Sequence, residues 1–100
     1  MIYLTQLIYI KEGQAAVFNE FEALAIPIIS NYNGRLLVRV RPDKAAYIES
    51  HIEEPYEIHI VEFDSEADFH AFAKDEERKK FLHLKEASIR TSLLFQGKKL

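Results

Sequence analysis

The chain has 100 residues, the usual size of one domain built around one hydrophobic core. Its net charge of −3 argues against general binding to nucleic acid or to anionic membranes, and the absence of cysteine excludes disulfides and thiolate chemistry. An apolar run opens the chain, but Lys11 ends it too early for a membrane span. These features predict a single domain over residues 1–100 in a mature, soluble, cytoplasmic protein.

The first third of the chain predicts a strand followed by a helix. Residues Ile2 to Ile10 are rich in Ile, Leu and Tyr, which is typical of a mostly buried strand. From Gln14 the period changes to that of an amphipathic helix, with an apolar stripe of Val17, Phe21, Leu24, Ile28 and Tyr32. Pro27 lies inside this helix, so we expect a kink near residues 23–25 or a break with a second short helix beyond. Gly34 is the expected left-handed cap.

A second strand is predicted from Arg35 to Arg41, where Pro42 stops it. Strict alternation directs one set of its side chains to each face of the sheet: Leu36, Val38 and Val40 to one, Arg35, Leu37, Arg39 and Arg41 to the other. Asp43 to Glu54 is longer than a tight hairpin needs, and we expect Tyr47 and Ile48 to pack back as a lid or short turn.

The second half predicts a strand, a helical region and a last strand. The run from Pro55 to Ser65 has strand composition and ends at a turn, where Ser65 can cap a helix with a buried side of Phe69, Phe72 and Ala73. Acidic residues followed by basic ones indicate a new helix start at Asp75, continuing to Ser88. Ile89 to Phe95 is the last strand, and residues 96–100 form a tail.

The resulting order, β-α-β-β-α-β, predicts an α+β ferredoxin-like fold. Its four-stranded antiparallel sheet has the spatial order 4-1-3-2, and both helices cover one face. The run from Pro55 is then a central strand. Because the other face is uncovered in one subunit, we expect a homodimer.

The two middle strands carry the candidate chemistry. If Ile58 and Ile60 join the core, then Arg39, Arg41, Glu57 and His59 share the opposite face, with Arg39 near His59 and Arg41 near Glu57. The two guanidiniums could bind a small carboxylate or oxyanion as substrate, and His59, together with Glu57, could serve as catalytic acid or base. Alternatively, these groups pair with each other across the dimer interface and only satisfy it.

The remaining polar and aromatic residues give weaker indications. Tyr32 and Tyr47 are predicted at the mouth of a pocket as substrate contacts. No histidine pair has the spacing of a zinc motif, and the three glycines are isolated, so neither a metal nor a cofactor is predicted.

Beyond these patterns, two segments carry a family resemblance. The run Pro55 to Ser65 followed by Phe69, Phe72, Asp75 and Arg78, and the segment from Pro27 to Leu37, resemble the small domain-of-unknown-function 1330 type over nearly the whole chain. Such proteins are similar to the dimeric α/β-barrel superfamily, in which two ferredoxin-like sheets pack face to face. That superfamily includes cofactor-independent monooxygenases, small isomerases and haem-handling enzymes.

The resemblance implies a homodimer and a pocket, but little chemistry. The chain lacks tryptophan, a residue that several oxygenase and haem-degrading members use in their pockets, and this counts against those activities.

Two hypotheses of function follow. The first is a homodimeric small-molecule-binding protein or cofactor-independent enzyme, acting by proton transfer or oxidation of a small polar compound, with its pocket between sheet and helices or at the dimer seam. The second is a non-enzymatic dimeric module whose polar sheet face serves assembly. A cavity of roughly a few hundred Å³ with His59 exposed to it would favour the first. A closed, filled sheet face with Arg39, Arg41, Glu57 and His59 all mutually bonded would contradict the enzyme hypothesis.

Overall fold

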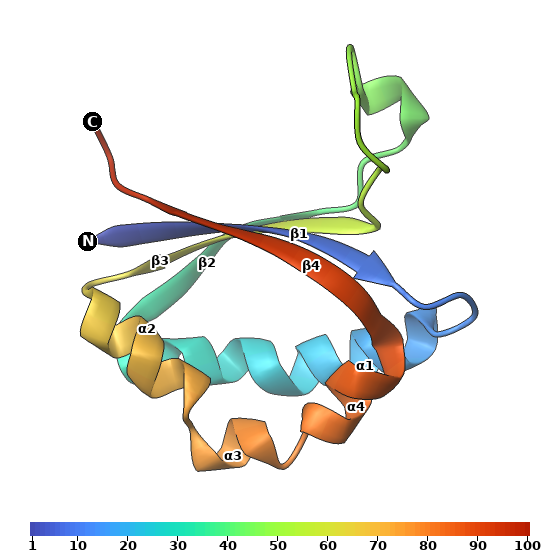
Figure 1. Ribbon diagram of the computed structural model, residues 1–100. Coiled ribbons are helices and arrows are strands. Elements are labelled where there is room, and N and C mark those ends of the chain that lie inside the picture. Colours follow the sequence, from blue (N-terminus) through green and yellow to red (C-terminus); the bar gives the residue numbers. More distant parts are fainter.

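Figure 1 shows the computed structural model, which describes all residues from Met1 to Leu100 as one sheet with its α-helices on a single face. The four antiparallel strands lie in the order β2-β3-β1-β4, which confirms the predicted order read from the other edge. The elements in chain order are β1 (Ile2–Ile10), α1 (Ala15–Ala25), the 3-10 helix η1 (Ile26–Tyr32), β2 (Gly34–Val40), the 3-10 helix η2 (Lys44–Ala46), β3 (Glu57–Phe63), α2 (Glu66–Ala73), α3 (Glu76–Lys79), α4 (Leu82–Ser88) and β4 (Ile89–Gly97). None of the helices has the length and hydrophobicity needed to cross a membrane.

The break expected at Pro27 is present, because α1 ends at Ala25 and the chain continues as a 3-10 helix. The left-handed residue at its end is Asn33, with φ of 57°, and the prediction of Gly34 as the cap was wrong. Gly34 instead begins β2 where no side chain fits. A Cβ added there would lie 2.6 Å from side-chain atoms of both Ile29 and Phe63.

The buried side of α1 only partly matches the predicted stripe, because Phe18 and Ala25 are buried in place of Val17 and Leu24. Phe18, Phe21 and Ala25 are buried, whereas Val17 is half-buried and Leu24 is 38% exposed. The buried side also contains Glu22, and this acidic residue among apolar ones hid the pattern in the sequence.

In the second half, Ser65 caps α2 as predicted by accepting a hydrogen bond from the Asp68 backbone N–H at 3.1 Å. Phe69 and Phe72 pack on Phe63 with ring centroids 5.6 and 5.5 Å away, while Ala73 is exposed and not part of the buried side.

The helical region from Asp75 to Ser88 is two helices, and the expectation of one continuous helix was wrong. Asp75 caps α3 as the charge pattern indicated, accepting from the Arg78 backbone N–H at 2.7 Å, and the chain breaks again before α4. The last strand extends to Gly97, two residues beyond its predicted end, because Gly97 pairs with Tyr3 of β1.

An irregularity in β2 decides which side chains face the helices. The register with β3 shifts between Leu36 and Val38, so Leu36 and Arg39 lie on the same face although their numbers differ in parity. Val38 pairs with Ile60 on the other face. Strict alternation grouped Leu36 with Val38 and Val40, and this grouping was wrong because Leu36 faces the helices and the two valines do not.

The two faces of β3 are opposite to the prediction. Phe63 is fully buried against the helices, and strand alternation puts Glu57 and His59 on that same face. Ile58 and Ile60 face the uncovered side, opposite Leu7 and Thr5 of β1. The isoleucines therefore do not build the core beneath the helices. The polar group does not face the open side.

The connection between β2 and β3, residues 41–56, projects from the open face as an arm (Figure 1). Its base is held to the sheet by the Tyr9 hydroxyl, which donates to the Glu53 carbonyl at 2.8 Å, and by the ion pair between Arg90 and Glu53. Tyr47 is half-buried, but Ile48 is fully exposed, so the expectation that both residues pack back was wrong for Ile48.

Candidate binding site between the sheet and the helices

Glu57 is the centre of a bonded cluster on the helix side of the sheet. Its side chain is 0% exposed and accepts hydrogen bonds from Arg39 Nε, from Arg41 Nε at 2.8 Å, and from His59 Nε2 at 2.6 Å. The structure thus brings together the four residues that the sequence grouped. Their role in binding or catalysis stays a prediction.

The strand register explains this convergence. Arg39 lies directly opposite His59, as predicted, and Arg41 follows β2 where Glu57 begins β3. Arg41 also bonds the Asn19 side chain of α1, and its guanidinium lies 4.9 Å from the centre of the Tyr56 ring. The cluster therefore spans from the sheet edge to the first helix.

The electrostatics of the cluster favour an ionised glutamate and a neutral histidine. Burial alone would raise the pKa of Glu57, but the hydrogen bonds from Arg39, His59 and Arg41 together hold it below its usual range. Burial lowers the pKa of His59 despite the opposing effect of the Glu57 carboxylate. Because Nε2 faces an acceptor, the proton of neutral His59 belongs on Nε2, and Nδ1 carries the lone pair.

A second group of charged residues comes from the helices and was missed by the sequence reasoning. Glu22 of α1 is 6% exposed, and Arg78 of α3 and Lys85 of α4 are half-buried. Burial raises the pKa of Glu22 to about 7, the charges of Arg39, Arg78 and Lys85 oppose that rise, and the charge of Glu57 adds to it. In the sequence, this group could have been found only from Glu22, an acidic residue on the buried side of α1.

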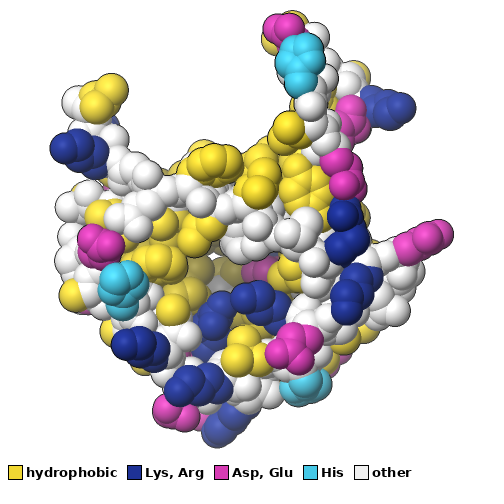
Figure 2. Space-filling model, in the orientation of Figure 1, with side chains coloured by type: hydrophobic (Ala, Val, Ile, Leu, Met, Phe, Trp, Pro, Cys, Tyr) yellow, Lys and Arg dark blue, Asp and Glu magenta, His cyan; other side chains and the backbone are white.

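Open space adjoins the Glu57 cluster. A pocket of about 430 Å³ is lined by Arg39, Arg41 and Glu57 of the cluster, together with Asn19 and Val40. Figure 2 shows a hollow between the sheet and the helices, with basic side chains gathered on its wall. Leu94 pairs with Gln6, which pairs with His59, so all three face the helices; Leu94 is nevertheless 51% exposed. No helix covers this part of the sheet closely.

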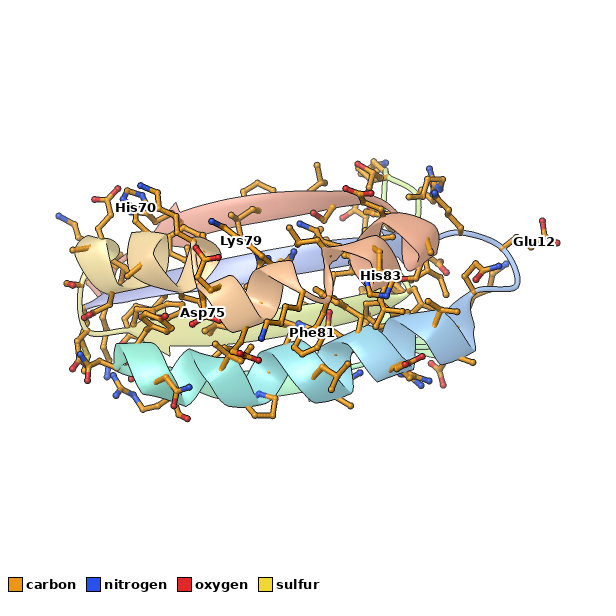
Figure 3. All side chains as sticks on the ribbon, turned by 90° about the horizontal axis from the view of Figure 1, so that it is seen from below. Glu12, His70, Asp75, Lys79, Phe81 and His83 are labelled. Carbon is orange, nitrogen blue, oxygen red and sulfur yellow. The ribbon has the colours of Figure 1, made fainter.

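The view from the helix side shows how the hollow is bounded. The stretch formed by α1 and η1 and the stretch formed by α2, α3 and α4 run side by side across the sheet, and Phe81 lies between them (Figure 3). The Tyr32 hydroxyl donates to Asp75 and ties the two stretches together. Figure 1 shows that α3 lies farthest from the sheet.

The two predicted tyrosines do not join the cluster. Tyr32 bonds Asp75 and packs on Phe72 at the other end of the helical layer. Tyr47 lies on the opposite side of the sheet, in a pocket of about 440 Å³ between the arm and the open face, where its hydroxyl is buried without a partner. Tyr47 therefore lines a pocket away from Glu57, and a substrate contact by either tyrosine stays a prediction.

The geometry of the cluster supports each of the two hypotheses of function in part. The cluster is mutually bonded and His59 is only 3% exposed, as an assembly role would require. A pocket of the expected size nevertheless adjoins Arg39 and Arg41, although His59 is not among its lining residues. The polar residues lie under the helices and not on the open face, so the hypothesis that a polar sheet face serves assembly was wrong in that respect. No group of three His, Cys, Asp or Glu side chains has the geometry to hold a metal ion.

Comparisons with known proteins place the chain in a family. The model of the domain of unknown function DUF1330 matches residues 4–97. The chain belongs to the DUF1330 family. No curated protein matches it significantly.

Solved structures share the fold of this DUF1330 protein. A protein of unknown function from Rhodopseudomonas palustris superimposes with a TM-score of 0.83 at 16% identity, covering 99% of this chain and 82% of that one. An uncharacterised NIPSNAP domain protein from Burkholderia xenovorans gives 0.74 at 15%, covering 100% and 95%. An Arabidopsis thaliana protein gives 0.79 at 13%, covering 100% and 96%. At these identities the likeness shows the ferredoxin-like fold alone.

Proposed function

We propose that this DUF1330 protein is a homodimer that binds a small polar molecule between the sheet and the helices and transfers a proton through His59. The observation that supports this most is the fully buried Glu57 carboxylate, which three cationic or donor groups surround beside a pocket of about 430 Å³. A buried ionic cluster adds little net stability compared with apolar packing, and perturbed ionisable groups beside a cavity are typical of functional sites.

The proposed chemistry uses the two nitrogens of His59 differently. Nε2 donates to Glu57, which fixes the ring and stabilises the imidazolium that forms when Nδ1 accepts a proton. Nδ1 has no protein partner and is not among the fully enclosed unpartnered atoms. It is therefore the available base. The guanidiniums of Arg39 and Arg41 are partly exposed, so donors not used by Glu57 can hold an anionic group of the ligand.

Hydrogen exchange at carbon tests the catalytic part. The protein should accelerate the replacement of carbon-bound hydrogen by deuterium in small ketones and keto acids in D2O, followed by NMR. His59→Gln should lower that rate by about 100-fold or more, because a positioned general base contributes this much. His51→Gln is the matched control, since His51 is exposed in the arm. Exchange that is equally fast in His59→Gln would refute the role of His59.

The homodimer is supported by the open face of the sheet. Val38, Val40, Leu93 and Phe95 are exposed there, and Figure 2 shows hydrophobic side chains along this side of the sheet, next to the arm. A contiguous apolar face of this kind is typical of an interface. A second copy of the sheet would cover it.

Analytical ultracentrifugation tests this assembly. The wild type should sediment with twice the monomer mass at micromolar concentration, and Val40→Glu should sediment as a folded monomer because it would bury an unpaired charge. Leu24→Glu is the control, since Leu24 is exposed on the helix layer, and it should remain dimeric. A monomeric wild type would sink the dimer without affecting the His59 proposal.

A further inference from the structure

Three charged side chains from three different helices remain without an ion-pair partner beneath the sheet. Glu22 is buried, and Arg78 and Lys85 are half-buried. Glu22 and Lys85 make no side-chain hydrogen bond, and the Arg78 guanidinium makes only a 3.4 Å contact with the Ala73 carbonyl. Charges removed from water usually form direct ion pairs, and none of these three side chains forms one.

The three residues come from the helices beneath the sheet, where Figure 2 shows a hollow with basic side chains on its wall. α1 packs along α4, which brings Glu22 and Lys85 to neighbouring helices, and the pKa of Glu22 responds to the charges of both Arg78 and Lys85. It also responds to Arg39 and Glu57 of the sheet. The helix group and the Glu57 cluster therefore lie close to each other in the interior between the sheet and the helices.

That interior carries an excess of positive charge although the whole chain is acidic. Four basic groups lie in or beside it, Arg39, Arg41, Arg78 and Lys85, against the buried carboxyl groups of Glu22 and Glu57. Two further acids act on the helix bases from outside this interior: Glu86 is exposed, and Asp75 already accepts from Tyr32 and from the Arg78 backbone N–H. A Glu22 pKa of about 7 means that near neutral pH one of the two buried acids is half protonated, which increases the excess. An excess of buried positive charge favours an anionic occupant.

The Arg78 guanidinium lacks a hydrogen-bond acceptor for one of its N–H groups. Its Nε is buried with no hydrogen-bond partner, and its guanidinium is positioned over the Phe72 ring at 5.2 Å from the centroid. A planar, positioned guanidinium is suited to two-point contact with a carboxylate. The walls nearby are apolar: Phe81 lies between the helical stretches (Figure 3) and Leu94 lies on the helix side of β4.

We infer that this space binds a small organic acid, with its carboxylate held by Arg78 and Lys85, the Glu22 carboxyl beside it, and its apolar body against Phe81 and Leu94. The inference deepens the proposed function, since it assigns a ligand class to the same interior, but it depends on different residues. Protonated Glu22 can donate to the bound carboxylate, whereas ionised Glu22 repels it. The other charged groups facing Glu22 are Arg39, Glu57, Arg78 and Lys85.

NMR titration tests the inference. Chemical shifts of the ¹⁵N-labelled protein are followed at pH 6 with acetate and benzoate, and with acetamide and benzamide as neutral matches. The acids should bind and the amides should not. Arg78→Met and Lys85→Met should each weaken the binding of the acids by about tenfold or more, because each removes a charge-assisted hydrogen bond. Lys79→Met is the matched control, since Lys79 is an exposed neighbour on α3 paired only with Glu76.

Glu22 supplies a second readout in the same experiment. Wild-type affinity for the acid should fall as pH rises from 6 to 8, and Glu22→Gln should remove that fall. The spectra themselves report whether each variant is folded.

The outcomes separate this inference from the proposed function. Failure of both acids to bind, equal binding of acids and amides, or unchanged affinity in Arg78→Met and Lys85→Met would each overturn the organic-acid site. If binding is lost in Arg39→Gln and Arg41→Gln but kept in the helix variants, the carboxylate site lies at the Glu57 cluster and the inference is wrong. If binding depends on Arg78 and Lys85 while His59→Gln leaves deuterium exchange unchanged, the ligand class stands and the proton-transfer function fails.

Discussion

The helix-facing side of β3 has two ends that differ in chemistry. At one end Phe63 is fully buried and packs with Leu4 and Ile29 in the hydrophobic core, where Phe69 and Phe72 cover it. At the other end Glu57 and His59 are just as buried but are surrounded by charged and polar groups. One strand face therefore contains both the apolar core and the candidate site.

This difference indicates that one end of the strand serves stability and the other serves the candidate site. The apolar end joins the sheet to η1 and α2 through contacts that stabilise any protein of this fold. The charged end borders open space, beneath helices of which α3 lies farthest from the sheet (Figure 1). Changes at the first end should alter stability at every pH, and changes at the second should alter pH dependence and binding.

Phe63→Ala should show the largest loss of stability. It removes a fully buried aromatic ring from contacts with Phe69 and Phe72, and such truncations cost about 3–5 kcal/mol in the free energy of unfolding. Urea denaturation at pH 5 and pH 8 should give similar losses. Leu24→Ala, at a 38% exposed site on α1, should stay within about 0.5 kcal/mol of wild type. A loss below about 1 kcal/mol for Phe63→Ala would mean that this end is not the core.

Much of the fold was predictable from the sequence because local patterns agree with tertiary structure. Ile2 to Ile10 has strand composition, Pro27 ends an α-helix, and Ser65 and Asp75 cap helices, so the element order and the sheet topology followed. The pairing of Arg39 with His59 also followed, because placing Val38 and Val40 opposite the isoleucines of β3 fixes the register at that end.

The side of the sheet on which the site lies was not predictable in the same way. Apolar Ile58 and Ile60 look like core residues, but they belong to an open face, whereas the buried face carries Glu57 and His59. A one-residue bulge at Leu37 reverses the parity of β2 and leaves no trace in composition. Glu22 and Lys85 were missed because their convergence depends on how α1 packs against α4, which periodicity does not report.

Glu22→Gln should change the pH dependence of stability. The folded pKa of Glu22 is raised from 4.5 to about 7, so its contribution is fully present below pH 4.5 and is lost as pH rises through 7. The glutamine variant cannot ionise. Relative to wild type it should therefore gain up to about 3 kcal/mol in the free energy of unfolding between pH 4 and pH 8, the equivalent of the pKa shift.

Urea denaturation across that pH range measures the gain. Glu20→Gln is the control, because Glu20 is an exposed neighbour on the same helix and should show no such change. A constant difference between Glu22→Gln and wild type from pH 4 to pH 8 would contradict the raised pKa, and with it the charged character of this end.

Gly34→Ala tests the packed end with a single methyl group. The added Cβ would lie 2.6 Å from side-chain atoms of Ile29 and Phe63, so these two core residues must move. Overpacking of this kind costs about 1–3 kcal/mol in the free energy of unfolding, measurable by urea denaturation. Gly97→Ala is the matched control, because a Cβ there meets nothing within 4 Å, and its stability should change little.

Combining Gly34→Ala with Phe63→Leu should cost less than the sum of the two single changes, since the smaller side chain makes room for the methyl group. Additive losses would show that the strain lies in the backbone and not in this contact.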